Sequence, residues 1–398
     1  MKDFLARNRI PYLWQDIEQD EVARQTVDRV NNGEHRLPVI FFPDGSTLIE
    51  PDLRTLAEKV GLRTQAAQPF YDLVIVGAGP AGLGAAVYGA SEGLRTLMID
   101  KEATGGQAGT SSRIENYLGF PNGISGADLA HRAASQAARL GAETITAQAV
   151  TNIRAEDSYR YVTLADGTEV GAKAVILATG VTVRRLDVPG VERLTGAGIY
   201  YGAALTEAAN YTGQHLFVVG GANSAGQGAM FFSRFASQVT MLVRGEGLEA
   251  SMSQYLIDQI EGTPNIDVRT RTQVIEAHGT ERLDALTLRT TIEENDSVEK
   301  FPAGALFLFI GAVPHSGIVA GLVARNSAGF IPTGQELVAD GKKPDGWRLK
   351  RDPFPLETSV PGIFAAGDIR QSAVRRVASA VGEGANAVSQ VHQYLKTV

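Results

Sequence analysis

The stretch from Tyr71 to Asp100 constrains the fold of this chain more than any other stretch. The apolar run at residues 73–76 predicts a buried parallel strand, and a turn rich in glycine follows it. An Ala-rich helix is predicted from Leu83 to Ser91, and a second short strand from Leu94 to Ile99. This order of strand, glycine-rich turn, helix and strand is typical of a βαβ unit that binds a dinucleotide.

The residues of the turn match the physical demands of such a site. Gly77 permits the tight turn, Gly79 lets a pyrophosphate approach the backbone, and Gly82 allows helix and strand to pack closely. The N–H groups at the helix start bind the phosphates, and an acid roughly 20 residues after the first glycine, here Asp100, accepts from a ribose hydroxyl. An ordinary glycine-rich turn would explain neither the strand before it nor the acid after it.

Composition narrows the class of protein further. The 398 residues allow two or three domains, and a net charge of −7 argues against nucleic acid or an anionic membrane as a partner. No signal peptide or membrane span is expected, so a cytoplasmic location is the default. The six histidines show no metal-binding spacing, and no metal site is predicted. The chain has no cysteine, which excludes disulfides, thiolate ligands and thiol chemistry.

Four short motifs follow the first βαβ unit. They are Gly-Gly-Gln at residues 105–107, Ile-Glu-Asn-Tyr-Leu-Gly-Phe-Pro at 114–121, Ala-Thr-Gly at 178–180 and Gly-Ile-Phe-Ala-Ala-Gly-Asp at 362–368. Together with the glycine-rich turn, they resemble the thioredoxin reductase family of two-domain flavoproteins. The resemblance covers roughly residues 70–398 and implies that the first unit binds FAD.

The resemblance also implies roles for individual residues. Gln107 and Asn116 would hydrogen-bond the isoalloxazine or the ribityl chain, and Asp368 would accept from a ribityl hydroxyl. The helix after Arg375 and Arg376 would point its N-terminus at the N1–C2=O edge of the flavin, where its dipole favours negative charge. The full set of expected FAD contacts is Gly77, Gly79, Pro80, Ala81, Gly82, Asp100, Lys101, Gly106, Gln107, Asn116, Thr179, Gly180, Gly367, Asp368, Arg375, Arg376 and Val377.

A second strand–turn–helix unit occupies residues 216–244, and the resemblance implies that it binds a nicotinamide dinucleotide. Ala222 stands in the place of the middle glycine, where its methyl group could crowd the pyrophosphate. Arg244 ends the second strand and can pair with a 2′-phosphate, and no acid sits there to prefer a free ribose diol, so NADPH is favoured over NADH. A domain that has lost nucleotide binding is the alternative. The expected contacts are Gly220, Gly221, Ala222, Asn223, Ser224, Ala225 and Arg244.

Residues 1–63 have a pattern of their own, and its expected elements are strands at Tyr12–Ile17, 37–42 and Thr47–Ile49 and helices at Glu21–Val30 and Asp52–Val60. This order, with a proline opening the third element, resembles the thioredoxin/glutaredoxin fold. The resemblance is partial, because the family's first strand and Cys-x-x-C helix start would lie before Met1. It implies a cis Leu37–Pro38 peptide, and we expect a packing module without catalysis of its own.

We therefore predict an α/β protein with two Rossmann-like dinucleotide-binding domains. The NAD(P)H domain is inserted into a discontinuous FAD domain, and a small partial thioredoxin-like α/β segment precedes both. The expected bounds are 1–63 for the segment, 64–70 for a linker, 71–184 with 304–398 for the FAD domain, and 185–303 for the NAD(P)H domain. The resemblance also implies a homodimer.

The missing cysteines restrict the reaction. Thioredoxin reductases carry Cys-Ala-x-Cys just before the second glycine-rich strand, and here Gly202 and Leu205 hold the cysteine positions. Reduction of a disulfide needs a protein thiolate, so the chain cannot follow that mechanism. We expect electrons to pass from NAD(P)H through FAD to a quinone, a small electrophile, ferredoxin, flavodoxin or O2. Glu207 is a candidate proton donor and Tyr201 a candidate to stack on the flavin, with a surface glutamate and a core tyrosine as the plainer interpretations. A flavin-binding redox sensor with a degenerate nicotinamide site is the alternative function.

Overall fold

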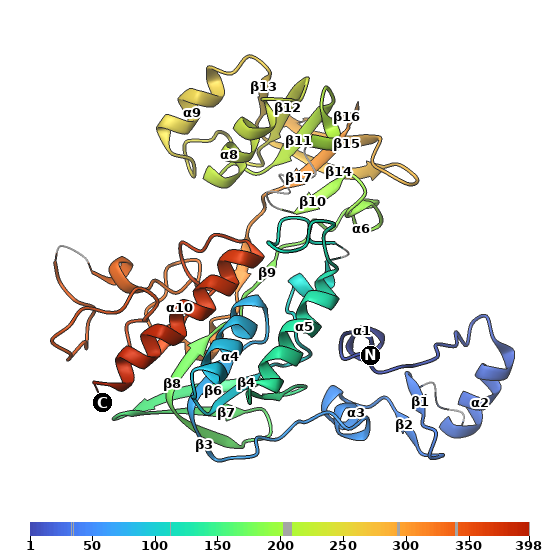
Figure 1. The fold of residues 1–398 in the computed structure, drawn as a ribbon. Helices are drawn as coiled ribbons and strands as arrows, with labels where there is room; N and C mark the ends of the chain where they lie inside the picture. The colour runs from blue at the N-terminus through green and yellow to red at the C-terminus, as the bar shows by residue number, and fades with distance from the viewer. Residues whose placement is uncertain are drawn as a thin grey trace. The chain divides into compact units, whose positions relative to one another are not determined.

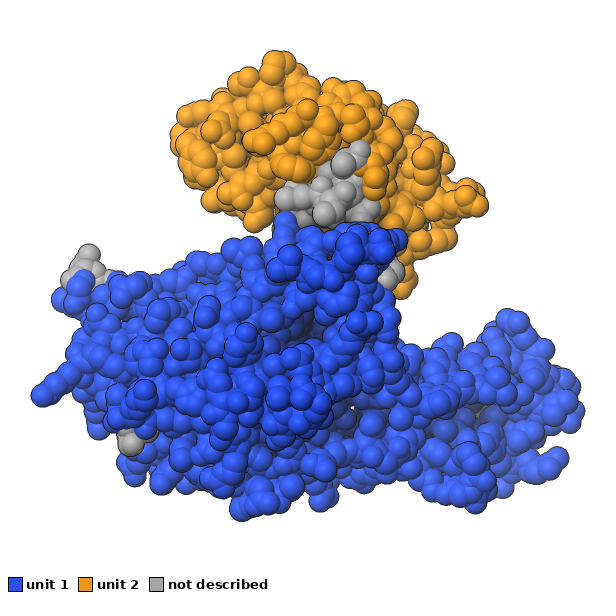
Figure 2. All heavy atoms as spheres, viewed as in Figure 1, with its two compact units in different colours: residues 1–181, 314–398 blue, residues 182–313 orange. Residues whose placement is uncertain are grey.

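A computed structural model describes the chain except Gly33, His35, Ser112, 202–208, Glu293, Glu294, Ala339, Asp340 and Val398. The chain divides into two compact units (Figure 2). Unit 1 comprises residues 1–181 and 314–398, and unit 2 comprises residues 182–313. The chain leaves unit 1 along β9 (Val181–Val183) and returns along β18 (Ala312–Pro314), and these two strands pair with each other.

A mixed sheet forms the centre of unit 1 (Figure 1). Its strands are β5 (Glu143–Ile145), β4 (Thr96–Ile99), β3 (Phe70–Val76), β8 (Glu169–Leu177), β7 (Tyr159–Leu164) and β6 (Val150–Glu156), in this spatial order. The first four are parallel, whereas β7 and β6 run antiparallel to their neighbours. β7 and β8 thus form a hairpin that turns at Gly167. The short strand β19 (Ile363–Ala365) adds in parallel to the end of β8.

Both faces of this sheet are buried, which explains the continuous apolar run in β3. Leu73 and Ile75 face one core and Val74 and Val76 the other, as the two-residue period of a strand requires. The first core lies under the helices α4 (Pro80–Ser91), α5 (Gly126–Arg139) and α10 (Val377–Leu395).

Small residues let α4 and α10 pack closely. A Cβ atom on Gly84 would lie 2.7 Å from the carbonyl oxygen of Val381, and one on Gly384 would lie 2.1 Å from that of Ala81. The last helix is therefore held against the first helix of the glycine-rich unit. The short 3-10 helices of unit 1 are η1 (Ala108–Thr110), η3 (Gly317–Val319) and η4 (Gly334–Leu337).

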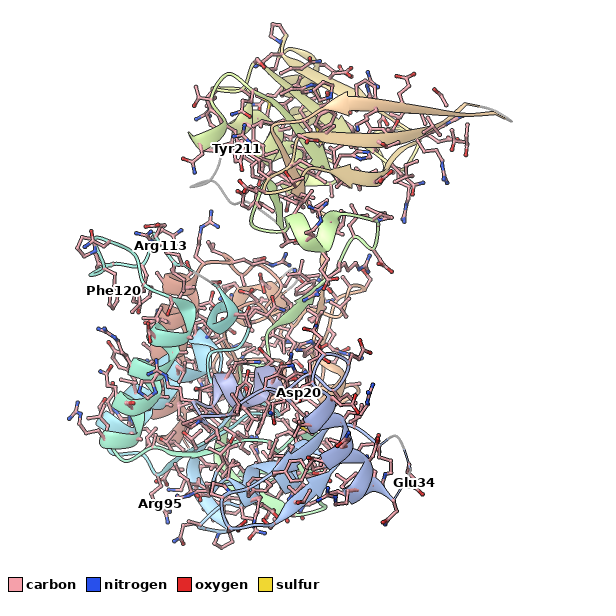
Figure 3. The ribbon with its side chains drawn as sticks, turned by 90° about the vertical axis from the view of Figure 1, so that its right-hand side faces the viewer. Asp20, Glu34, Arg95, Arg113, Phe120 and Tyr211 are labelled. Atoms are coloured by element: carbon pink, nitrogen blue, oxygen red, sulfur yellow. The ribbon has the colours of Figure 1, made fainter. Side chains whose placement is uncertain are left out.

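The N-terminal segment of unit 1 contains α1 (Lys2–Arg7), α2 (Glu21–Asn31), β1 (Val39–Phe41), β2 (Thr47–Ile49) and α3 (Leu53–Lys59). Asp20 caps α2 (Figure 3), and Asp52 caps α3. The Leu37–Pro38 peptide is cis, as the resemblance implied.

The predicted strand at Tyr12–Ile17 was wrong. These residues form no regular element, and the side chain of Leu13 is 86% exposed. Among the described residues, the sheet of this segment consists of β1 and β2 alone, so residues 12–17 have no neighbouring strand to complete their backbone hydrogen bonds.

Unit 2 is built on a five-stranded parallel sheet. Its order is β10 (Ile199–Tyr201), β17 (Ala305–Leu308), β11 (His215–Val219), β12 (Gln238–Leu242) and β13 (Ile266–Arg269). The helices α8 (Asn223–Phe232) and α9 (Gln254–Glu261) cover one face of this sheet. The confirmed fold class is therefore α/β with two Rossmann-type units.

An antiparallel sheet covers the other face of the parallel sheet in unit 2. It consists of β14 (Thr272–His278), β15 (Ala285–Ile292) and β16 (Asn295–Pro302), with α6 (Val191–Leu194) packed beside it. A 3-10 turn, η2 (Ala209–Tyr211), leads into β11. In the described part of the chain, no helix has both the length and the apolar character needed to cross a membrane.

Candidate functional site: two glycine-rich turns

The turn between β3 and α4 has the geometry that its glycines predict. Gly77 has a φ of +103°, and a Cβ atom there would lie 2.4 Å from the carbonyl oxygen of Ala178. A Cβ on Gly82 would lie 1.8 Å from the carbonyl oxygen of Gly77, so helix and turn touch at this point. Gly79 differs from these two glycines. A Cβ atom on Gly79 would have the Cα of Gly106 as its nearest neighbour, at 3.9 Å. The middle glycine thus leaves room for a ligand to approach the backbone.

Asp100 closes the turn from the end of β4. One carboxylate oxygen accepts from the backbone N–H of Ala78 at 2.8 Å, and the other accepts from Glu102 at 2.9 Å and Ala103 at 3.1 Å. Burial raises the pKa of Asp100, while these N–H donors and the charge of Arg7 act in the opposite direction. A carboxylate offers about four acceptor positions, so about one is left for a ribose hydroxyl.

The Gly105–Gln107 loop lies directly against the glycine-rich turn. The N–H of Gly105 donates to the carbonyl oxygen of Ala78 at 2.7 Å, and a Cβ on Gly106 would lie 3.0 Å from the Cα of Gly79. The side-chain amide of Gln107 donates to the carbonyl oxygen of Val181. The structure therefore brings Gly79, Asp100, Gly106 and Gln107 together.

The Ala-Thr-Gly segment is held by His315, a residue without a predicted contact. The hydroxyl of Thr179 donates to the carbonyl oxygen of His315 at 2.9 Å, and the ring Nδ1 of His315 lies 2.9 Å from the carbonyl oxygen of Thr179. The N–H of His315 donates to the carbonyl oxygen of Gly180. This histidine therefore fixes the segment that follows β8.

The second fingerprint, after β19, meets the first. A Cβ on Gly367 would lie 3.0 Å from the Cβ of Ala81 in α4. The N–H of Gly367 donates to Glu383 at 2.7 Å, and the same carboxylate pairs with Arg370 at 2.6 Å. Glu383 from α10 thus holds the backbone just before Asp368.

Asp368 is the polar group best placed for a ligand. The residue is partly buried, and its carboxylate accepts no hydrogen bond from the described residues. Burial raises the pKa of Asp368, Glu383 adds to that effect, and Arg375 opposes it. A desolvated carboxylate without a protein donor is expected to accept from a ligand hydroxyl.

Other predicted FAD residues lie at the surface. Asn116 is exposed on the loop that carries Arg113 and Phe120 (Figure 3), and its side chain makes no hydrogen bond within the described part of the chain. Lys101 is exposed, with Glu102 4.0 Å away. The exposed Arg375, whose guanidinium lies 5.5 Å from the ring centre of Phe330, precedes Arg376 and Val377 at the start of α10.

The second glycine-rich turn, between β11 and α8, is pinned by two serines. Asn223 accepts from both the N–H and the hydroxyl of Ser253 at 2.8 Å, and the hydroxyl of Ser251 donates to the carbonyl oxygen of Gly221 at 2.9 Å. Gly220 has a φ of +142°, which favours glycine.

The turn's remaining residues lie at the start of α8. Ala222 is exposed and takes the N-cap position, Ser224 is exposed, and Ala225 is buried. Arg244 is exposed just after β12, and its guanidinium pairs with no acid among the described residues. The helix start and this arginine can receive anionic groups.

Of the two candidate catalytic residues, Tyr201 and Glu207, the structure describes Tyr201 alone. The hydroxyl of Tyr201 accepts from the N–H of Leu186 at 3.1 Å, and the partly buried ring packs in the core of unit 2. Glu207, like Gly202 and Leu205, lies outside the described residues.

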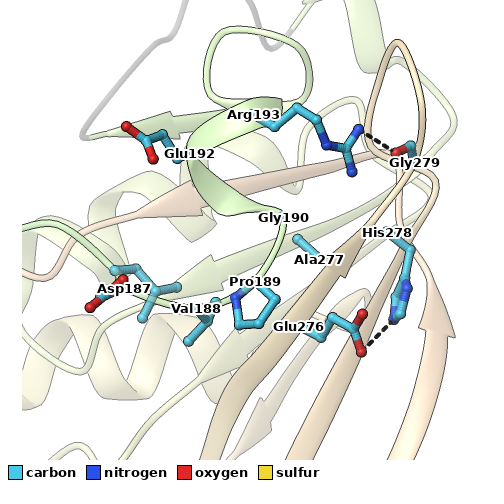
Figure 4. Close-up of a pocket in the computed structure, with 11 residues that line it drawn as sticks. Asp187, Val188, Pro189, Gly190, Glu192, Arg193, Glu276, Ala277, His278 and Gly279 are labelled. Atoms are coloured by element: carbon cyan, nitrogen blue, oxygen red, sulfur yellow. Dashed lines mark hydrogen bonds and ion pairs between the residues drawn. The ribbon is translucent and has the colours of Figure 1, made fainter. Parts of the chain in front are cut away.

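Unit 2 also has a surface pocket of about 690 Å³ that sequence reasoning did not indicate (Figure 4). Its walls are residues 186–190, Glu192, Arg193 and residues 276–279 at the end of β14. Arg193 donates to the carbonyl oxygens of Gly279 at 2.6 Å and Thr280 at 2.9 Å, and His278 lies 3.7 Å from Glu276. These groups are paired with one another, so we assign no ligand to the pocket.

Sequence reasoning missed Arg7, His315 and Glu383 as residues of the first site. Arg7 contacts Glu102, and His315 contacts Thr179, across long stretches of sequence. Glu383 contacts Gly367 across an irregular loop. The Gly-Glu-Gly triplet at 382–384 was an available signal for Glu383, because flanking glycines allow close packing and an acid in a packed region is almost always paired.

Two Rossmann-type units, each with a glycine-rich turn between a parallel strand and a helix, define a class of protein. They are the architecture of oxidoreductases that use two dinucleotides. A family model described as "Pyridine nucleotide-disulphide oxidoreductase" matches residues 71–384. The chain belongs to this family.

Its relatives confirm the resemblance to thioredoxin reductases. Thioredoxin reductase of Treponema pallidum (strain Nichols) is 33% identical over 328 residues, which cover 82% of this chain and 98% of the relative. That of Bacillus subtilis (strain 168) is 33% identical over 330 residues, covering 83% and 96%. The crystal structure of thioredoxin reductase from Streptococcus pyogenes MGAS5005 matches with a TM-score of 0.71 and 32% identity, covering 83% of this chain and 100% of that chain.

Proposed function

We propose that this protein is an FAD-dependent NAD(P)H oxidoreductase that passes electrons to an acceptor other than a disulfide. One observation carries the proposal: a member of the pyridine nucleotide-disulphide oxidoreductase family has no cysteine in its 398 residues. Disulfide exchange requires a thiolate, and no other side chain supplies one. The oxidoreductase architecture is retained while the dithiol chemistry is lost.

The residues of unit 1 fit FAD. Gly79 leaves space at the start of α4 for a pyrophosphate, and Asp100 keeps about one acceptor position for the adenosine ribose. Asp368 offers a desolvated carboxylate to a ribityl hydroxyl, and Gln107 lies beside the same turn. Bound FAD accepts a hydride from a nicotinamide and delivers the electrons to a second substrate.

In unit 2, the start of α8 and Arg244 support a nicotinamide dinucleotide. The guanidinium of Arg244, just after β12, pairs with no acid among the described residues and suits a 2′-phosphate, so we propose NADPH as the donor, with NADH as the alternative. The proposed acceptors are a quinone, a small electrophile, ferredoxin, flavodoxin or O2. Tyr201 and Glu207 remain the proposed residues at the reacting face, and a cytoplasmic homodimer is the proposed form.

The proposal is tested by anaerobic mixing of the purified protein with NADPH or NADH. The expected results are copurified or readily bound FAD and bleaching of the visible flavin band, faster with NADPH. Steady-state oxidation of NADPH with quinones, ferricyanide, ferredoxin and oxygen then identifies the acceptor class. A protein that binds FAD but is bleached by neither nucleotide contradicts the oxidoreductase proposal.

One observation favours a second function, a flavin-binding redox sensor. Ala222 replaces the middle glycine of the nicotinamide turn, and a methyl group at this position can crowd a pyrophosphate. The sensor requires FAD that a nicotinamide does not reduce, together with a partner whose binding changes with the flavin redox state.

A further inference from the structure

The family match begins at Tyr71, yet the segment before it reaches the first nucleotide site. The helix α1 is fixed in place by Phe4 and Leu5, which are buried against Leu56, Ala57 and Ala147. On the same helix, Arg7 extends to the loop that joins Asp100 to Gln107.

The guanidinium of Arg7 contacts this loop at three points. One nitrogen donates to the carboxylate of Glu102 at 3.0 Å, and the other reaches the carbonyl oxygens of Ala103 at 3.2 Å and Gly106 at 3.4 Å. Only 14% of the Arg7 side chain is exposed, and its Nε is buried without a partner in the described part of the chain. Asp3, one turn earlier in α1, lies 3.7 Å from the same guanidinium.

The loop needs such support because it contains two consecutive glycines. Gly105 and Gly106 have φ values of +106° and +54°, and glycine has the greatest backbone freedom of all residues. The carbonyl groups that Arg7 binds lie on both sides of Gly105. A planar guanidinium that joins two such acceptors restricts the backbone between them.

The loop also carries the residues with which unit 1 is proposed to bind FAD. Asp100 stands at its start, Gly106 lies directly against Gly79 beside the pyrophosphate position, and Gln107 ends it. A shift of the loop would therefore displace Asp100, Gly106 and Gln107 relative to the glycine-rich turn.

We propose that Arg7 is a positioning residue for FAD, which makes flavin binding depend on the segment that precedes the family fold. The inference rests on the proposed function, since it takes FAD as the ligand of unit 1. Arg7 acts through the loop, by holding the carbonyl groups of Ala103 and Gly106 and the side chain of Glu102.

The test compares Arg7→Ala and Arg7→Lys with Arg54→Ala in the full-length chain. Arg54 also ties the segment to the rest of unit 1, through a 2.9 Å ion pair with Asp166, but it makes no contact with the loop. Each apoprotein is titrated with FAD, and quenching of the flavin fluorescence gives the dissociation constant. Melting temperatures with and without saturating FAD, and the midpoint potential of the bound flavin, are measured in parallel.

Arg7→Ala is expected to raise the FAD dissociation constant about tenfold, the effect of losing one hydrogen bond to a charged group. Arg7→Lys keeps the charge but not the fork, and is expected to recover part of the affinity. Arg54→Ala should stay within about twofold of the wild type. The midpoint potential should shift in Arg7→Ala, and FAD should raise its melting temperature less than that of the wild type.

An unchanged FAD affinity and potential in Arg7→Ala, with equal melting shifts for apoprotein and holoprotein, overturns the proposal and leaves Arg7 a purely structural residue. Equal losses of affinity in Arg7→Ala and Arg54→Ala also overturn it, because docking of the whole segment would then be responsible. Failure of the wild type to bind any FAD refutes the proposed function itself, and the inference falls with it.

Discussion

Replacement of Glu383 by alanine should destabilise unit 1 and weaken its nucleotide site together. The Glu383 carboxylate accepts from the N–H of Gly367 at 2.7 Å and from Arg370 at 2.6 Å. Arg370 also donates to the hydroxyl of Thr333 at 2.9 Å, which leaves its second nitrogen without an acceptor when Glu383 is removed. The backbone N–H that loses its partner immediately precedes Asp368.

The magnitude follows from the two lost hydrogen bonds and the burial of the pair. A hydrogen bond to a charged group contributes about 1.5–3 kcal/mol, and breaking a fully buried ion pair costs about 3–5 kcal/mol. The side chains of Arg370 and Glu383 are 14% and 19% exposed. Water can therefore partly solvate the guanidinium of Arg370 and the N–H of Gly367 when Glu383 is removed. We therefore expect a loss of about 3 kcal/mol, which at an unfolding entropy of about 2.1 cal/mol/K per residue lowers the melting temperature of a 398-residue chain by about 4 °C.

Thermal and urea unfolding followed by circular dichroism measure this loss. Glu383→Gln keeps an acceptor for Gly367 without the charge and should lose about half as much. Glu92→Ala is the matched control. Glu92 lies 3.0 Å from His392, which belongs to α10 as Glu383 does, but this pair is more exposed. Its loss should be about 0–1 kcal/mol. If Glu383→Ala loses no more stability than Glu92→Ala and binds FAD as the wild type does, the reasoning is refuted.

Three further predictions concern unit 2. Arg244→Ala should weaken NADPH binding about tenfold and leave NADH binding within about twofold, measured by titration with each nucleotide; equal effects on both would contradict a 2′-phosphate contact. Ala222→Gly should tighten nicotinamide binding about two- to fivefold by removing a methyl group from the pyrophosphate position, and unchanged affinity would show that this methyl group is harmless. Burial lowers the pKa of His215, whose ring stacks on Phe217 and bonds Thr240 at 2.8 Å. Because the unfolded chain then takes up its proton at a higher pH than the folded chain, stability should fall as pH drops through about 6.5. His215→Gln should reduce that fall in urea unfolding between pH 7.5 and 5.5, whereas His131→Gln, at an exposed helix position, should leave it unchanged.

Local patterns predicted the regular elements well where each element depends on its own residues. The apolar run of β3 and the glycines of the first turn behave as expected, because hydrophobic period and steric demand are local properties. The failure at Tyr12–Ile17 has the opposite cause. A strand exists only with a hydrogen-bonded neighbour, and the apolar pattern of these residues does not reveal whether one is present.

The first nucleotide site shows the same division. The glycines, Asp100 and Asp368 follow from motifs, since each motif encodes a turn and the acid beside it. The sequence could not show that three N–H groups already occupy most of the Asp100 carboxylate, because these donors depend on how the loop after β4 folds back. Nor could it show that the Asp368 carboxylate has no donor among the described residues.

By itself the sequence determined that this chain has two units of strand, glycine-rich turn and helix and no thiol, which together indicate an oxidoreductase architecture and exclude disulfide reduction through a protein thiolate. Only the tertiary structure decided that Arg7, His315 and Glu383 hold the loops of the first site. The physical reason is that a turn's backbone demands are met by adjacent residues, whereas the side chains that hold a loop in place come from whichever elements pack beside it. The packing of α1, His315 and α10 within unit 1 is a property of the whole fold.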